Sequence, residues 1–69
     1  MSANKWGERL RAARVKEGDT QDQAAWKLGI KERGYLSNLE LGKKRPSVGL
    51  ALKIESIYGV PIDLLRSAA

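Results

Sequence analysis

The side chains best suited to chemistry in this sequence are basic and amide groups, because the usual nucleophiles and metal ligands are missing. The 69 residues include no Cys and no His, which removes the thiolate nucleophile, sulfur-bound zinc and the commonest general base. Thirteen Lys and Arg residues against eight Asp and Glu give a net charge of +5. This composition argues against an enzyme and against a metal or other cofactor, and it favours a polyanionic partner.

The excess positive charge lies in two separate stretches. Residues 1–16 carry five bases and one acid, and residues 31–45 carry five bases and two acids. Between them, residues 17–30 are net acidic, and residues 46–69 are neutral. A polyanion is therefore expected to bind the part of the chain that precedes the neutral, apolar C-terminal third.

The length of the chain predicts one small domain over residues 1–69. Such a chain is too short to close a substrate cleft between two domains. Its longest apolar stretch falls far short of the roughly 20 residues that span a bilayer, and no apolar signal segment opens the sequence. We therefore expect a cytoplasmic protein without a membrane anchor.

The elements that must position the basic and amide groups are all predicted to be helices, since no segment alternates apolar and polar residues as a strand would. The first helix is expected over about residues 5–17 and the second over about residues 21–28. Thr20 and Gln23 have the spacing of a capping box at the start of the second helix. Gly29 is placed to end it.

Three further helices complete a predicted compact five-helix bundle. The third is expected over about residues 32–41, with Leu36 and Leu39 facing inward. Ser47 can cap the fourth helix, and a proline favours a short fifth helix over about residues 61–66. The apolar stripe expected to bury the fourth helix is Val48, Ala51, Ile54, Ile57 and Tyr58.

The connection between the second and third helices has the spacing of a helix-turn-helix. Ala25 lies one helical turn before Gly29, so a small inward side chain precedes a residue that tolerates positive φ. Ile30 and Leu36 supply apolar contacts that can hold the two helices at a sharp angle. Ala and Gly four residues apart also recur by chance, so this spacing alone is weak support.

A much longer series of residues, from Trp6 to Leu65, follows the spacing of one known family. The series is Gly7, Leu10, Arg14, Gly18, Thr20, Gln21, Ala25, Leu28, Gly29, Tyr35, Leu36, Ser37, Glu40, Gly42, Lys43, Arg45, Pro46, Ser47, Ile54, Gly59, Val60, Ile62, Asp63 and Leu65. It resembles the phage repressor and Cro-like (Xre-type) helix-turn-helix family. The resemblance implies a lambda-repressor-like fold of five helices, binding of double-stranded DNA through the third helix, and usually a homodimer.

The sequence departs from the family pattern near the turn and in the core. Residues 31–32 occupy the place of one capping residue, so the turn is expected to be one residue longer. Asp19 stands where the family commonly has an apolar residue, and Ala24 stands where Leu is usual. Trp6 or Trp26 is expected to refill the volume that Ala24 leaves.

The resemblance assigns the candidate contact residues. Arg33, Gly34 and Asn38 match the base-reading positions, and Arg suits guanine O6 and N7 as Asn suits adenine N6 and N7. The alternative for these residues is a solvated polar face. Seven residues are expected to contact phosphates: Gln21, Lys31, Tyr35, Ser37, Lys43, Lys44 and Arg45.

Two further sets are expected to serve structure and assembly. Arg14 and Glu40 match a family pair that joins the first helix to the end of the third. Tyr58, Val60 and Leu64 are expected to form an exposed apolar cluster and a two-fold dimer contact. The alternative is that this cluster only closes the bundle.

Together these features predict a non-enzymatic, sequence-specific regulator of transcription, such as a repressor, that binds a pseudo-palindromic operator as a homodimer. A protein-interaction or coactivator module of the same fold, which does not read DNA, is the alternative from another class. The basic stretches around the third helix favour DNA. Binding to random DNA in rising salt separates the two.

Overall fold

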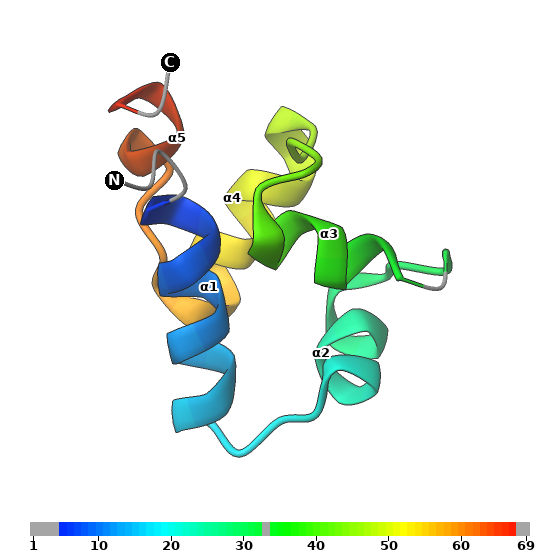
Figure 1. Cartoon of the computed structure of the whole chain (residues 1–69). Helices are drawn as coiled ribbons and strands as arrows, with labels where there is room; N and C mark the ends of the chain where they lie inside the picture. The colour runs from blue at the N-terminus through cyan, green and yellow to red at the C-terminus, as the bar shows by residue number, and fades with distance from the viewer. Residues whose placement is uncertain (1–4, 33, 68–69) are drawn as a thin grey trace.

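The computed structural model describes residues 5–32 and 34–67, and within these residues the chain forms five helices and no strand. They are α1 (Lys5–Lys16), α2 (Gln21–Leu28), α3 (Tyr35–Leu41), α4 (Val48–Tyr58) and α5 (Asp63–Ser67). Figure 1 shows α1 beside α5 at one side of the molecule and the crossed pair of α2 and α3 at the other. The predicted all-α five-helix fold is confirmed.

Local side-chain chemistry fixes the ends of α2 and the start of α4, as the sequence predicts. The Thr20 hydroxyl accepts from the Gln23 backbone amide, and the Gln23 side chain accepts from the Thr20 amide. Gly29 ends α2 in a left-handed conformation with φ of +72°. The Ser47 hydroxyl accepts from the Leu50 amide at the start of α4. These contacts satisfy amides that have no partner inside the helix.

The third helix begins later than predicted, at Tyr35 instead of about residue 32. Gly34 precedes it with φ of +82°, a left-handed conformation that an α-helix does not include. The longer turn therefore takes up the residues that the prediction gave to the first turn of the helix. Gly34 has no side chain that could cap the helix, so α3 begins without the side-chain hydrogen bond that Ser, Thr, Asp or Asn provides at this position.

The core is formed by one cluster to which all of the first four helices contribute. Its buried members are Trp6, Leu10, Ala24, Leu28, Leu36, Leu39, Ile54 and Val60. Trp6 is buried in the core, whereas Trp26 is 84% exposed. Of the two tryptophans expected to fill the volume that Ala24 leaves, only Trp6 therefore lies in the core. α1 packs against α3, α4 and α5, and α2 packs against α3 and α4.

Part of the predicted apolar stripe of α4 faces solvent. Ala51 and Ile54 are buried, but Val48 and Ile57 are exposed. The stripe is wider than the strip of α4 that the other helices cover, so its edges stay in water. Across the described residues, no helix is both long and apolar enough to cross a membrane.

Candidate nucleic-acid interface

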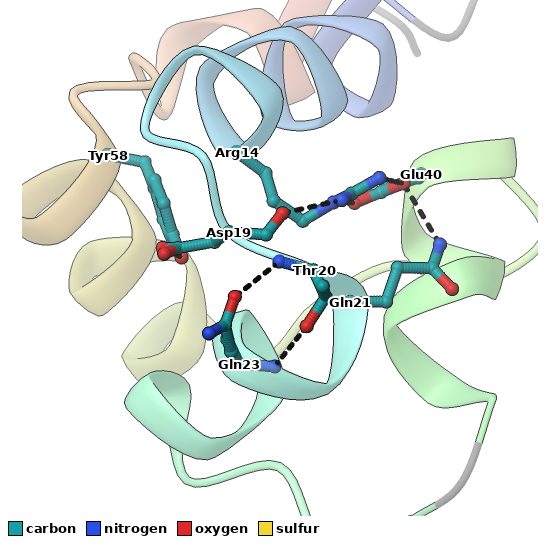
Figure 2. A network of polar contacts seen from close by, with 7 residues as sticks. All are labelled: Arg14, Asp19, Thr20, Gln21, Gln23, Glu40 and Tyr58. Carbon is teal, nitrogen blue, oxygen red and sulfur yellow. Dashed lines mark hydrogen bonds and ion pairs between the residues drawn. The ribbon is translucent and has the colours of Figure 1, made fainter.

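A polar network holds the helix-turn-helix against α1 (Figure 2). Arg14 Nε of α1 lies 2.7 Å from Glu40 Oε2 at the end of α3, and Arg14 Nη2 donates to Glu40 Oε1 over 3.3 Å. Arg14 Nη1 also donates to the backbone carbonyl of Asp19 over 2.8 Å. The Arg14 and Glu40 side chains are 11% and 3% exposed. This ion pair, formed by the two residues expected to join the helices, ties α1 to α3.

The same carboxylate also holds the first residue of α2. Gln21 Nε2 donates to Glu40 Oε1 over 3.1 Å, so Glu40 links all three of α1, α2 and α3. Gln21 itself stays exposed at the helix start, where free backbone amides and the positive end of the helix dipole favour an anion. Its side chain therefore orients α2 from the protein side, while its backbone remains open to a phosphate.

A second set of contacts explains how an acid replaces an apolar residue before α2. Asp19 Oδ2 accepts from Lys27 Nζ over 2.6 Å and from the Tyr58 hydroxyl over 2.7 Å. The hydrogen bond from Lys27, followed by that from Tyr58, lowers the pKa of Asp19 below its ordinary value. Burial, followed by the hydrogen bond to Asp19, raises the pKa of Tyr58. The α1–α2 connection is thus bonded to the end of α4.

The turn between α2 and α3 encloses a hollow. The amides of Gly29 and Ile30 both donate to the Ala25 carbonyl, which turns the chain sharply after α2. The hollow that results lies between α2, the turn and the start of α3. Its lining residues are Gln21, Asp22, Ala25, Trp26, Ile30, Lys31, Glu32, Gly34, Leu36 and Ser37.

The structure brings four of the candidate contact residues together around this hollow: Gln21, Lys31, Gly34 and Ser37. Tyr35 lies on the other side of α3, in a second hollow shared with the start of α4, and its ring packs against the core. Asn38 is half-buried in the middle of α3. Arg33, the first of the predicted base-reading residues, lies outside the described residues.

The basic segment, residues 43–45, is fixed to the end of α3 by backbone hydrogen bonds. The Asn38 carbonyl accepts from the amides of Gly42, Lys43 and Lys44, the last two over 2.9 and 3.4 Å. Arg45 Nη2 donates to the Leu65 carbonyl over 3.1 Å. All three basic side chains are exposed. Their backbone is therefore held in place while their charges face solvent.

Two features of this surface are missing from the sequence-based assignment. The exposed indole of Trp26 borders the hollow, although an aromatic residue on an amphipathic helix is more often buried. The carboxylates of Asp22 and Glu32 also line the hollow. Their positions depend on how α2 and α3 are turned about their own axes, which the spacing around the turn does not indicate.

The residues expected to form an exposed dimer contact are not exposed together. Val60 is 2% exposed and belongs to the core, so its prediction as a surface residue is wrong. Leu64 is half-buried against the same core, and the Tyr58 hydroxyl donates a hydrogen bond to Asp19. After Gly59 the chain turns inward, and the apolar residues at this end close the bundle.

Within residues 5–32 and 34–67, no group of three or more acidic side chains is arranged to hold a metal ion. Five helices packed on one core, with α2 and α3 crossed at a tight turn, define a helix-turn-helix domain. The family described as helix-turn-helix matches residues 10–65. The chain therefore belongs to this helix-turn-helix family, of the phage repressor and Cro-like (Xre) type.

Three relatives share substantial identity with the chain. The SPbeta prophage-derived uncharacterized HTH-type transcriptional regulator YonR of Bacillus subtilis is 38% identical over 60 residues, which cover 87% of this chain and 55% of YonR. The HTH-type transcriptional regulator ImmR of Bacillus subtilis is 42% identical over 59 residues, with 86% and 46% covered. An uncharacterized HTH-type transcriptional regulator of Archaeoglobus fulgidus is 40% identical over 55 residues, with 80% and 77% covered.

The chain spans about half the length of the two Bacillus subtilis relatives. No solved structure shows significant similarity to it.

Proposed function

We propose that this domain binds double-stranded DNA and regulates transcription, as a homodimer on a pseudo-palindromic operator. The names of all three relatives describe transcriptional regulators, which supports this function over catalysis. The net charge of +5 supports a polyanionic partner.

One observation carries the proposal: the basic segment is anchored to α3, and the charges of its two lysines face solvent. The Asn38 carbonyl holds the amides of Lys43 and Lys44, and neither lysine forms an ion pair with any described residue. Because these hydrogen bonds join the segment to α3, a phosphate bound by the lysines would fix how deep α3 enters the major groove. Contact with the DNA backbone would thereby position α3 for reading the bases.

In the proposed complex, α3 lies in the major groove with Asn38 toward the bases, Gly34 at its start and Ser37 toward a phosphate. The absent side chain of Gly34 leaves room for close approach, since a Cβ there would meet nothing within 4 Å. The open end of α2 at Gln21 faces the backbone on one side of the groove, and the basic segment faces it on the other. A homodimer would place two such units about 34 Å apart, one turn of B-DNA.

Fluorescence anisotropy with a random-sequence duplex in rising salt tests the proposal. Three to five phosphate contacts per subunit, or about six to ten per dimer, predict a log–log slope of about −5 to −9. Lys43→Ala with Lys44→Ala removes two contacts from each subunit of the dimer and should make the slope shallower by about three to four. Arg9→Ala removes a charge that is exposed on α1 and lines neither hollow, so it is the matched control.

A slope near zero, or no binding at low salt, would contradict DNA binding. The exposed Trp26 beside Asp22 would then favour the alternative, a protein-interaction module of the same fold. Selection of sites from a random library identifies the operator and shows whether it is palindromic.

A further inference from the structure

An open groove of about 740 Å³ runs between α1 and the end of α3. The charged and large apolar residues that line it are Glu8, Arg11, Val15, Lys16, Glu40 and Leu41. Val15 and Leu41 are 58% and 61% exposed, so two large apolar side chains face water in the same groove. Apolar side chains gathered in a groove with a polar rim are typical of an interaction surface.

The exposed charge of this groove is net positive. Arg11 and Lys16 are exposed, and neither forms an ion pair with a residue that the structure describes. Of the two acids, Glu40 is 3% exposed and is bound by Arg14, which leaves Glu8 as the exposed carboxylate among the lining residues. Glu8 lies two turns before Lys16, about 12 Å along the helix, which is longer than the screening length in physiological salt.

The groove ends beside the basic segment, residues 43–45. Leu41 precedes Lys43 by two residues, so their Cα atoms lie within about 8 Å of each other. Hydrogen bonds from the amides of Lys43 and Lys44 to the Asn38 carbonyl keep these residues at the end of α3. An occupant that extends past the end of the groove therefore meets exposed cations again.

We propose that this groove binds an acidic amphipathic helix of a partner protein. The apolar side chains of that helix cover Val15 and Leu41, and carboxylates beside its apolar stripe pair with Arg11 and Lys16. Arg11 lies one turn before Val15 on α1, so a carboxylate and an apolar side chain one turn apart on the partner helix match both. The volume of the groove is sufficient for several side chains from one face of a helix.

The chemistry of the groove favours this occupant over DNA and over a second copy of the chain. A DNA backbone offers phosphates to Arg11 and Lys16, but it does not cover the apolar side chains of Val15 and Leu41. A second copy that used the same groove would bring the same net positive charge to it. An acidic amphipathic helix matches both the cations and the apolar side chains.

Fluorescence anisotropy with a labelled synthetic peptide tests this inference. The probe is a helical peptide of about 18 residues, with leucines at positions i, i+4, i+7 and i+11 and with glutamates and alanines elsewhere. The unmodified chain should bind it, and more weakly as the salt concentration rises. Two control peptides should bind at least about tenfold more weakly. One has lysine in place of every glutamate, and the other has the same composition with leucines that do not share a face.

Variants of the groove are compared with matched changes elsewhere. Val15→Ser removes apolar contact and should weaken peptide binding on the order of fivefold. Val48→Ser changes an exposed valine outside the groove and should not weaken it. Arg11→Glu reverses a charge in the groove and should weaken binding on the order of tenfold. Arg9→Glu makes the same change of net charge outside the groove and should have a much smaller effect.

Binding of a random-sequence duplex by the same variants separates this groove from the proposed DNA interface. Val15→Ser should leave the affinity for the duplex unchanged, and circular dichroism verifies that each variant is folded. The inference is overturned if the chain does not bind the amphipathic peptide or binds the scrambled one as tightly. It is also overturned if Val15→Ser acts like Val48→Ser, or if it weakens duplex and peptide binding equally, since the groove would then be a DNA contact. Failure to bind any duplex would contradict the proposed function alone, because peptide binding is measured without DNA.

Discussion

Replacing Arg14 with alanine tests whether the network around Glu40 holds α1, α2 and α3 together. The substitution removes the ion pair with Glu40 and the hydrogen bond to the Asp19 carbonyl. Only Gln21, among the contacts drawn in Figure 2, still donates to the carboxylate. Because the Glu40 side chain is 3% exposed, water cannot replace the lost guanidinium without a shift of the helices.

Breaking a buried pair by removing one partner generally destabilises a protein by about 3 to 5 kcal/mol. The remaining hydrogen bond from Gln21 and the 11% exposure of the Arg14 side chain place this case at the lower end, so we expect a loss of about 3 kcal/mol. For a domain of this size that corresponds to a fall in Tm of about 12 to 24 °C. A domain of 69 residues has a total stability of only about 3 to 10 kcal/mol, so much of the variant should be unfolded at 37 °C.

Urea unfolding followed by circular dichroism measures the loss, with Arg9→Ala as a control that changes an exposed α1 residue and should stay within about 0.5 kcal/mol. The double variant Arg14→Leu with Glu40→Leu removes both charges and should be more stable than Arg14→Ala. A loss below about 1 kcal/mol for Arg14→Ala would refute the reasoning. A double variant that is less stable than Arg14→Ala would also refute it, because the destabilisation would then not come from a buried carboxylate that has lost its guanidinium partner.

Three further predictions address base reading, acid stability and the turn. Asn38→Ala should weaken binding to the preferred site by about 1 to 3 kcal/mol and relax its sequence preference, whereas Lys44→Ala should weaken all sequences alike in anisotropy titrations. The hydrogen bond from Lys27, followed by that from Tyr58, lowers the pKa of Asp19 below 3.8. Asp19 therefore binds its proton less tightly in the native state than in the unfolded state. The stability that Asp19 contributes is complete above about pH 4 and is lost as the pH falls through the lowered pKa, so Asp19→Asn should flatten the acid side of the Tm profile. Gly34→Ala forces a Cβ into a left-handed conformation and should destabilise the domain by about 1 kcal/mol, whereas Gly49→Ala, in open space without positive φ, should not destabilise it.

The features that could be predicted from the sequence depend on residues close together in the chain. The capping box at Thr20, the cap at Ser47 and the stop at Gly29 each require only a few neighbouring residues. Their geometry is set by backbone hydrogen bonds within one turn. The ion pair of Arg14 and Glu40 spans 26 residues, and only the family resemblance indicated it.

The features that could not be predicted depend on how the helices are turned toward one another. Val48 and Val60 are both apolar, yet the first is exposed and the second is buried. Which edge of an apolar stripe becomes covered is decided by the neighbouring helices and not by the stripe. The exposure of Trp26 and the hydrogen bond between Asp19 and the end of α4 also depend on the orientation of neighbouring helices, so the sequence did not predict them.

In the proposed DNA interface, the hollow and the basic segment carry different charges. On the side of the hollow, Asp22 and Glu32 stand beside Lys31, so a phosphate there would meet two carboxylates and one described cation. On the other side, the exposed basic segment presents three cations in sequence. Phosphate contacts and their salt dependence are therefore expected mainly from the basic segment. A carboxylate that is repelled by phosphates can still accept a hydrogen bond from the amino group of cytosine in the major groove. Asp22 and Glu32 therefore weaken binding of the DNA backbone beside the hollow, but they can contribute to the choice of DNA sequence.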